Sequence, residues 1–391
     1  MSIYLDNAAT VPLVEPAIAA LTQAMRKIGN ASSLHSDGRS VRKDVEDARM
    51  KLAELVNCEP SEVIFTGSGT EADNLAVKGF FWKSVSQNPT RNIILTSAFE
   101  HHAILDPIQW LAEHDGAQVA LLPINSHGVI DLEFARTFIE ANRDSIALIS
   151  VMHSNNELGS IQPIAELVEL AGGIPVHSDA VQSFGKVDFD FAASGLTAAT
   201  ISGHKIGAPL GIGALILKRG VDLTPVLHGG GQERELRSGT LNAPAIVALA
   251  AAASHALQTM CENADAIAEL RGYTEAKILA IIPGAHLNSN AEKKLPGIIN
   301  IAFTGCESEA LLLLLDAAGI SASAGSACSA GVSRPSHVLL ALGRSEDEAM
   351  SALRFSLGSQ TTKEEIDTLI EILPAVVEKA RSAFNVKKGV A

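Results

Sequence analysis

The chain has 391 residues, of which 47% are hydrophobic and 19% are charged, so it is long enough to bury more than one hydrophobic core. Its formal net charge of −14 argues against a nucleic-acid-binding protein, because phosphate binding requires a basic surface. The longest apolar run covers 245–253, far short of the ~20 residues that span a bilayer, and the chain does not begin like a signal peptide, so we expect a soluble cytoplasmic protein with no membrane and no direct nucleic-acid partner.

Short β-rich runs alternate with helical segments through the first part of the chain. A run at 62–65 precedes a helical pattern over 70–81, and a run at 92–96 precedes a second helical pattern over 103–114. Further β-rich runs cover 117–124, 145–152, 173–178 and 213–218. Strands that alternate with helices favour an α/β fold with a mainly parallel sheet between layers of helices.

The pattern changes after Pro244. An alanine-rich helical run extends from there to about Ala280. Shorter strands then follow at 297–303 and 352–357, between helices. This change predicts that a smaller α+β domain follows the large α/β domain, with a boundary near residue 260.

The segment IFTGSGTEADN joins the first β-rich run to the first helix. Free N–H groups at the start of that helix, around Gly69 and Thr70, favour an anion such as phosphate. An ordinary capped turn would look the same. A dinucleotide site is a further alternative, because GSGTEA fits G-x-G-x-x-A and Glu100 could supply the acid after the next strand. The motif alone does not decide between them.

Asp179 directly follows a β-rich run, and Lys205 lies between a short strand and the glycine-rich turn of ISGHKIGAPLGIG. A lone lysine is usually a solvated surface charge, but a buried one can lose its charge and become a nucleophilic amine. A Schiff-base lysine, a carboxylate for a pyridinium nitrogen and a phosphate loop are together the parts of a pyridoxal 5'-phosphate site. All three occur at strand ends of one predicted sheet, where ligands of open α/β sheets bind.

The four cysteines form no C-x-x-C motif, which argues against a zinc or redox-pair site, and we expect no metal. Cys58, Cys261 and Cys306 are expected to be small buried residues. Cys328 differs from them, because it lies in the segment SASAGSACSAGVS. The Ser, Ala and Gly residues of this segment give little side-chain volume to bury. We expect this stretch to carry a thiol that moves.

In combination, these motifs resemble the cysteine desulfurases of the NifS and IscS type, which are class V aminotransferase-like, fold-type-I pyridoxal phosphate enzymes. The resemblance runs from YLDNAAT at Tyr4 to LRFSLG at Gly358, and includes EHHAILD, HSNNELG, HSDAVQS, SGHKIGAPLGIGAL, HGGGQERELRSGT and GSACSAG. It implies a large cofactor-binding domain at 16–260. It also implies a small domain, made of 1–15 and 261–391, that carries the catalytic cysteine.

The resemblance further implies roles for single residues. Lys205 would bond covalently to the cofactor, Asp179 would pair with its ring nitrogen, and His101 would stack on the ring and move protons. The residues that would contact the cofactor are Gly69, Thr70, His101, Asn156, Asp179, Gln182, Ser202, His204, Lys205 and Thr240 of the partner subunit, which implies a homodimer. Among them, Gln182 would bond the ring hydroxyl. Asn156 and Arg354 would hold the substrate carboxylate.

The activity implied by the resemblance is removal of sulfur from L-cysteine, which leaves L-alanine and a persulfide on Cys328. The sulfur would pass to an acceptor protein, such as an iron–sulfur scaffold or a thiolation enzyme. A pyridoxal phosphate-dependent aminotransferase or a selenocysteine lyase on the same fold is the alternative. A nicotinamide-dependent oxidoreductase would leave Lys205 and Cys328 without a task.

Overall fold

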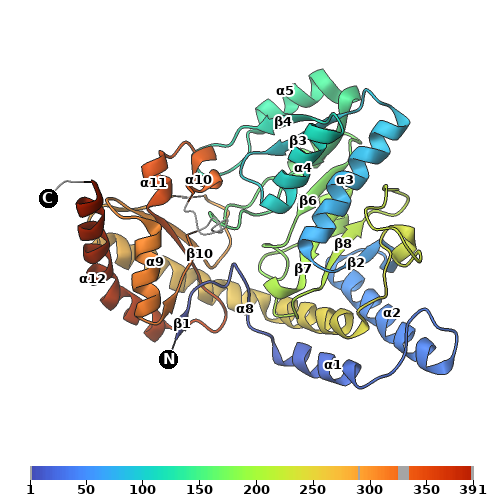
Figure 1. Cartoon of the computed structure of the whole chain (residues 1–391), viewed down its shortest axis with the longest axis horizontal. Coiled ribbons are helices and arrows are strands. Elements are labelled where there is room, and N and C mark those ends of the chain that lie inside the picture. Colours follow the sequence, from blue (N-terminus) through green and yellow to red (C-terminus); the bar gives the residue numbers. More distant parts are fainter. Residues whose placement is uncertain (1, 289–290, 325–333, 389–391) are drawn as a thin grey trace.

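The computed structural model describes residues 2–288, 291–324 and 334–388 (Figure 1). A seven-stranded sheet forms the larger body of the molecule. Its strands, in spatial order, are β2 (Val63–Thr66), β8 (Gly213–Leu217), β7 (Ala198–Ser202), β6 (Val176–Asp179), β5 (Ile146–Ser150), β3 (Ile93–Ser97) and β4 (Gln118–Leu122). Only the pairs that involve β8 are antiparallel, so the expectation of a mainly parallel sheet is confirmed.

The helices lie around this sheet and at the far end of the molecule. They are α1 (Glu15–Met25), α2 (Ser36–Val56), α3 (Gly69–Gln87), α4 (His102–His114), α5 (Leu132–Asn142), α6 (Ile164–Ala171), α7 (Phe191–Ser194), α8 (Ala243–Ile281), α9 (Ser308–Ala317), α10 (His337–Ala341), α11 (Glu346–Met350) and α12 (Lys363–Lys388). Single 3₁₀ turns are η1 (Pro60–Glu62), η2 (Arg143–Ser145), η3 (Gly203–Lys205) and η4 (Glu233–Glu235).

Alternate residues of a strand pack against different helices, as the two-residue period of a strand requires. In β2, Ile64 belongs to the apolar cluster that contains residues of α3 and α4. Its neighbours Val63 and Phe65 belong to the cluster on the other face, which contains residues of α2, α5, α6 and α8. Because helices cover both faces, the strands other than β4 consist of buried residues.

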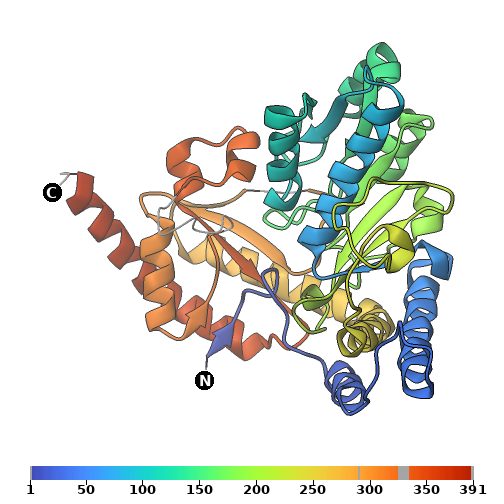
Figure 2. The same cartoon turned by 45° about the vertical axis from the view of Figure 1, so that its right-hand side comes forward.

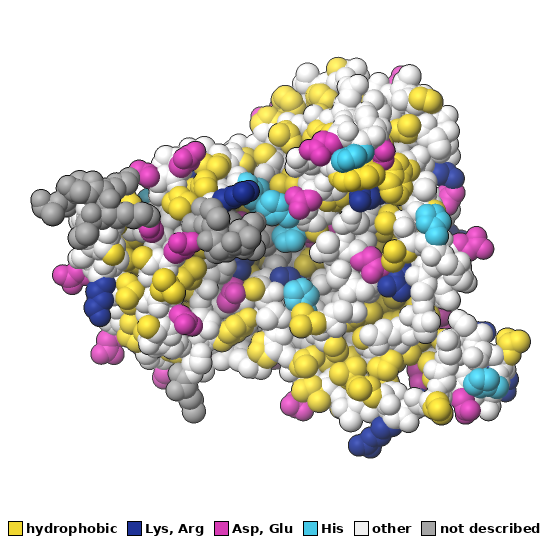
Figure 3. All heavy atoms as spheres, viewed as in Figure 1, with side chains coloured by type: hydrophobic (Ala, Val, Ile, Leu, Met, Phe, Trp, Pro, Cys, Tyr) yellow, Lys and Arg dark blue, Asp and Glu magenta, His cyan; other side chains and the backbone are white. Residues whose placement is uncertain are grey.

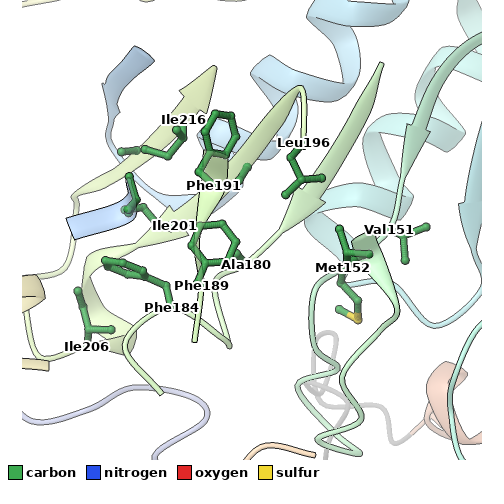
Figure 4. Packing of buried hydrophobic residues seen from close by; sticks show 14 of the residues in the cluster. Val151, Met152, Ala180, Phe184, Phe189, Phe191, Leu196, Ile201, Ile206 and Ile216 are labelled. Carbon is green, nitrogen blue, oxygen red and sulfur yellow. The ribbon is translucent and has the colours of Figure 1, made fainter. Parts of the chain in front are cut away.

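Aromatic side chains fix the segment that follows β6. Phe184 and Phe189 meet edge to face, with ring centroids 6.4 Å apart. Figure 4 shows Phe191, Ile201 and Ile206 in the same cluster. Buried aromatic rings contribute a large share of core stability. They therefore hold in place the stretch of chain between Asp179 and α7.

The smaller body is built from both ends of the chain (Figure 2). Its antiparallel sheet has the order β12-β10-β9, with β12 at Ala352–Ser356, β10 at Ile298–Phe303 and β9 at Ala285–Leu287. The N-terminal strand β1 (Ile3–Tyr4) pairs in parallel with β11 (Ile320–Ser321). Residues near the N-terminus therefore lie beside β12, where Asp6 forms a bridge to Ser356.

Helix α8 joins the two bodies (Figure 1). It has 39 residues, begins with Asn242 as its cap and Pro244 in its first turn, and packs against α1, α2 and α12. By length and composition alone it could cross a membrane, yet its first turns are buried in the protein core. Because α8 passes residue 260 without a break, the domain boundary there stays a prediction.

The turn η4 has an unusual backbone. Glu233, Arg234 and Glu235 have φ angles of 45°, 59° and 64°, in the left-handed region that side chains with a Cβ disfavour. The Glu233 carboxylate anchors the turn, because it accepts two hydrogen bonds from Arg49, at 2.9 and 2.6 Å, and one from the N–H of Phe65 at 2.7 Å. This buried charge pair holds the strained turn against β2.

Replacing Glu235 by glycine is expected to stabilise the protein by about 0.5–1 kcal/mol. Glycine adopts a left-handed φ without steric cost, while its greater freedom in the unfolded chain cancels part of the gain. Glu235 is exposed, so its side chain has little packing to lose. The free energy of unfolding from denaturant titrations measures the effect. The matched control, Glu169→Gly in the exposed face of α6, is expected to lose about 1 kcal/mol, and a loss at Glu235 would contradict the argument.

Candidate active site

A cavity of about 540 Å³ lies at the carboxyl ends of β3, β5, β6 and β7. Its lining includes ten of the twelve residues that the sequence singled out, namely Gly69, Thr70, His101, Asn156, Asp179, Gln182, Ser202, His204, Lys205 and Arg354. Figure 3 shows histidine, lysine and arginine side chains gathered around a hollow on this face. The volume suits a small organic ligand.

Two singled-out residues are placed differently. Thr240 is exposed and does not belong to the lining of this cavity. Cys328 lies outside the described residues. Residues on either side of that stretch, Ser323 and His337, do line the cavity.

The start of α3 forms one wall of the cavity. Ser68 caps the helix, and its hydroxyl accepts a hydrogen bond from Glu71 N at 3.0 Å. A side chain at position 69 would be crowded, because a Cβ on Gly69 would lie 3.0 Å from Cγ2 of Val181 and 3.1 Å from Cβ of Ser202. A Cβ on Gly213 would also meet the Ser68 backbone at 2.8 Å. The N–H groups of Gly69 and Thr70 precede the first bond of the helix, from Ala72 N to Ser68 O, so they can bind an anion.

Lys205 ends the 3₁₀ turn that follows β7. Its amine donates to the carbonyl oxygens of Ala8 and Ala9, at 2.6 and 2.7 Å. Burial lowers its pKa to about 8, the charge of Arg354 adds to this effect, and Asp179 opposes it. A larger fraction of neutral amine is therefore present at physiological pH than for an exposed lysine.

Asp179 is the last residue of β6. Its carboxylate accepts from Val181 N at 2.9 Å. Burial raises its pKa to about 6, while the hydrogen bond from Val181 and the charge of Lys205 act in the opposite direction. The side chain is therefore mainly ionised at neutral pH, so it can stabilise a cation in the cavity.

His101 caps the N-terminus of α4. Its Nδ1 accepts a hydrogen bond from Ala103 N at 3.1 Å. Desolvation by the surrounding protein and the positive charge of Lys205 lower its pKa to about 4. The ring is therefore neutral and carries its proton on Nε2, since Nδ1 is an acceptor. This leaves His101 with one N–H donor at the cavity.

Gln182 and Lys205 converge on a single oxygen. Gln182 Nε2 donates to Ala8 O at 2.9 Å, and Lys205 Nζ donates to the same oxygen at 2.6 Å. The two donor groups therefore lie close to one another. They can serve two neighbouring polar groups on one small ligand.

Arg354 comes from β12 in the smaller body and is only 4% exposed. Its guanidinium donates to Asp6 Oδ1 at 2.8 Å and to the Asn156 carbonyl at 3.0 Å. Within the described residues, the Nε–H has no hydrogen-bond partner. A buried donor without a partner is costly, so this group is poised to bind an acceptor such as a carboxylate.

The sequence-based prediction missed three acidic residues of the lining, Asp6, Asp73 and Glu157. Asp6 pairs with Arg354, although it is part of YLDNAAT, a motif that gave it no role. Asp73 is 1% exposed within the predicted helix, and burial together with the charge of Asp179 raises its pKa well above the usual value. The sequence could have revealed Asp73, because it is a charged residue on the apolar face of that helix.

Glu100 does not fit the dinucleotide alternative. It is fully buried, and its carboxyl group accepts from Ser97 Oγ at 2.5 Å and from Met152 N at 2.9 and 3.1 Å. Burial raises its pKa to about 8, so it is mainly protonated at neutral pH. A group committed in this way is not available to bind a ribose hydroxyl.

The other cysteines are less uniform than expected. Cys306 is 2% exposed, as predicted, but Cys58 is half-buried and Cys261 is exposed. The expectation for Cys261 was wrong because it lies between the two buried stretches of α8, which end at Ala253 and resume at Thr274. Burial and the nearby Glu62 and Glu59 raise the pKa of Cys58 to about 12. None of these three thiols lines the cavity.

The chain matches the aminotransferase class-V family model over residues 3–369. It is 47% identical over 389 residues to an IscS-like cysteine desulfurase of Mycobacterium tuberculosis, covering 99% of each chain. A solved NifS-like protein has a TM-score of 0.87 and 32% identity, with 97% of this chain and 99% of that chain covered. SspA in complex with cysteine has a TM-score of 0.79 and 33% identity, covering 92% and 100%.

Proposed function

The chain belongs to the aminotransferase class-V family and, within it, to the cysteine desulfurases, and on this premise we propose that its cavity binds pyridoxal 5'-phosphate and removes sulfur from L-cysteine. The observation that carries the proposal is the meeting of Lys205, Asp179 and the start of α3 in one cavity. An amine of lowered pKa, an ionised carboxylate and an anion-binding helix start are the groups that this cofactor requires.

The residues of the cavity fit the cofactor group by group. Lys205 would bond to its aldehyde carbon, and Gln182, whose donor shares an acceptor with Lys205, would contact the neighbouring ring hydroxyl. Asp179 would pair with the ring nitrogen. The phosphate would be held by Gly69, Thr70, Ser202, His204 and Thr240 of the partner subunit. When bound, the cofactor supplies an electron sink next to the substrate.

The chain's own groups orient the substrate and move its protons. Arg354, whose Nε–H is unpaired among the described residues, and Asn156 hold the carboxylate of L-cysteine. Lys205 exchanges a proton at its amine, for which its pKa near 8 is well matched. His101 is neutral and can stack on a ring and donate its Nε2 proton.

Cys328 completes the reaction as a nucleophile. Its thiolate attacks the sulfur of the substrate, so that an S–S bond forms while the C–S bond breaks. The carbon keeps the electron pair and takes up a proton, which gives L-alanine. The persulfide on Cys328 then passes its outer sulfur to an acceptor protein, such as an iron–sulfur scaffold or a thiolation enzyme, in the cytoplasm.

A homodimer fits the position of Thr240. This residue is exposed and does not line the cavity of its own chain, so it is free to serve the cavity of a second copy. Large apolar side chains are exposed on and around α1, where Figure 3 also shows apolar surface; they are Leu13, Ile18, Met25, Ile28 and Leu34. Contact with a second copy would remove this surface from water.

The test of this function uses the purified chain with the cofactor, L-cysteine and a thiol reductant. We expect equal amounts of L-alanine and sulfide, with no 2-oxo acid required. An aminotransferase would instead need a 2-oxo acid and would leave the sulfur on its product. A selenocysteine lyase would turn over L-selenocysteine and leave L-cysteine unchanged. Either of those results would overturn the proposal.

Replacing Arg354 by lysine is expected to raise KM for L-cysteine about 10–100-fold with a smaller effect on kcat. A lysine keeps the charge but loses the planar pair of donors that a carboxylate accepts, worth about 1.5–3 kcal/mol. Steady-state kinetics measure the change. Cysteamine, which lacks the carboxylate, should bind both proteins equally well. An unchanged KM would show that Arg354 is only the structural partner of Asp6.

A further inference from the structure

Lys186 is an amine beside the active site that the proposed reaction leaves without a task. Its Nζ lies 3.1 Å from Oε1 of Gln182. Lys186 also lines a second, smaller cavity of about 120 Å³ that adjoins the first at Ala8 and Lys205. The amine is therefore one hydrogen bond away from the residue that faces the cofactor.

The two ends of the Gln182 amide have opposite hydrogen-bonding character, and their partners fix the orientation. An ammonium group only donates and a backbone carbonyl only accepts. With Oε1 toward Lys186 and Nε2 toward Ala8 O, both bonds form, at 3.1 and 2.9 Å. If the amide turned over, its NH₂ would face the ammonium group and its oxygen would face the carbonyl oxygen. Both bonds would be lost, so the two partners select the same orientation.

We propose that Lys186 is a positioning residue that holds the amide of Gln182 with its N–H group toward the ring oxygen of the cofactor. This inference rests on the proposed function, in which Gln182 contacts that oxygen. The N–H end already points at Ala8 O, the acceptor that it shares with Lys205. A donor at this point competes for the electrons of the ring oxygen and so changes the proton affinity of the bound cofactor.

The charge on Lys186 determines the pH at which its effect on cofactor affinity is expected to be largest. Burial lowers its pKa to about 7, and the positive charges of Lys205 and Arg354 act in the same direction. Below pH 7 the side chain is mainly an ammonium group, which cannot accept a bond from a turned amide. Cofactor affinity is therefore best compared at pH 6.

The experiment compares Lys186→Met and Lys186→Arg with the wild-type protein. We expect the methionine variant to bind the cofactor about 10-fold more weakly at pH 6, the equivalent of one charge-assisted hydrogen bond. The visible absorption of the bound cofactor is expected to titrate about one pH unit higher. The arginine variant keeps a donor and should resemble the wild type. Lys218→Met, at an exposed lysine that follows β8, is the matched control and should change nothing.

A double variant that combines Lys186→Met with Gln182→Ala shows whether Lys186 acts by positioning Gln182 or has a general structural role. Lys186→Met should have no further effect on either readout once Gln182 is alanine, because the two residues act as one unit. Additive effects would overturn the inference and leave the proposed function intact. If Gln182→Ala itself changes neither readout, the contact between Gln182 and the cofactor is wrong, and the inference falls with it.

A second variant keeps the test decisive if Lys186→Met does not fold. Gln182→Glu preserves an acceptor for Lys186 and replaces the N–H donor by an oxygen. We expect this protein to fold, to bind the cofactor more weakly than Gln182→Ala does, and to show the higher titration. Cofactor binding as tight as in the wild type would overturn the inference, because no donor at this position would then be needed.

Discussion

Replacing Lys205 by alanine is expected to lower turnover by at least about 10³-fold, because the reaction loses both its covalent attachment point and its main proton carrier. The protein is expected to fold. The side chain contributes two hydrogen bonds to the Ala8 and Ala9 carbonyls and little apolar packing, so its loss costs only about 1–3 kcal/mol. Alanine production from L-cysteine measures turnover.

Lys205→Arg is the sharper variant, since it retains the charge and the donors but has no nucleophilic amine. It should be as inactive as the alanine variant and more stable. Borohydride reduction of the wild-type protein with its cofactor, followed by peptide mass mapping, is expected to place the label on the peptide that contains Lys205. A label on another lysine of either protein would show that the covalent attachment is assigned to the wrong residue.

Cys328→Ser is expected to stop the reaction before alanine is released, while cofactor binding remains. Serine has nearly the same size but offers no polarisable thiolate to attack sulfur. In the wild type, a single turnover should add one sulfur atom to the peptide that contains Cys328. A thiol reductant should remove it. Mass spectrometry of the digested protein measures both outcomes.

The remaining cysteines serve as matched controls. Serine variants of Cys58, Cys261 and Cys306 are expected to keep full activity. The first of these thiols has a pKa raised to about 12, the second is exposed on α8, and the third is buried beside the Val377 carbonyl. A persulfide on any of them, or full alanine production by Cys328→Ser, would contradict the assigned nucleophile.

The mainly parallel sheet and most of the cavity could be predicted from local patterns. Strands that helices cover on both faces consist of continuous apolar residues, so their sequences are recognisable as β-rich runs. The observed β2 and β3 lie within one residue of the runs at 62–65 and 92–96. Asp179 ends β6, and Lys205 ends the short turn that follows β7, so both were expected at the same edge of the sheet. Residues at strand ends could therefore be assigned to the cavity from the sequence.

Long-range pairing could not be predicted in this way. The strand β1 has only two residues, and it exists because Ile3 and Tyr4 pair with residues near position 320. The place of Asp6 depends on that pairing, and so does its ion pair with Arg354. No local period in the first ten residues reveals a partner more than 300 positions away.

Side-chain orientation is a second limit. The motif HSDAVQSFGK shows that Gln182 and Lys186 lie four positions apart, but the segment is a turn and not a regular helix. Which end of the Gln182 amide faces Lys186 depends on the Ala8 carbonyl, which comes from the other end of the chain. The strained turn at Glu233 is equally hidden, because its sequence contains no glycine.

The anchored turn at Glu233 also affects how the sheet can associate with other chains. β2 lies at an edge of the sheet, and edge strands with free N–H and C=O groups act as templates for aggregation. Here the Glu233 carboxylate binds the N–H of Phe65, and Arg49 binds the Val63 carbonyl at 2.7 Å. An incoming strand finds these groups already occupied, so a backbone strained at three successive residues shields this edge from amyloid-like growth.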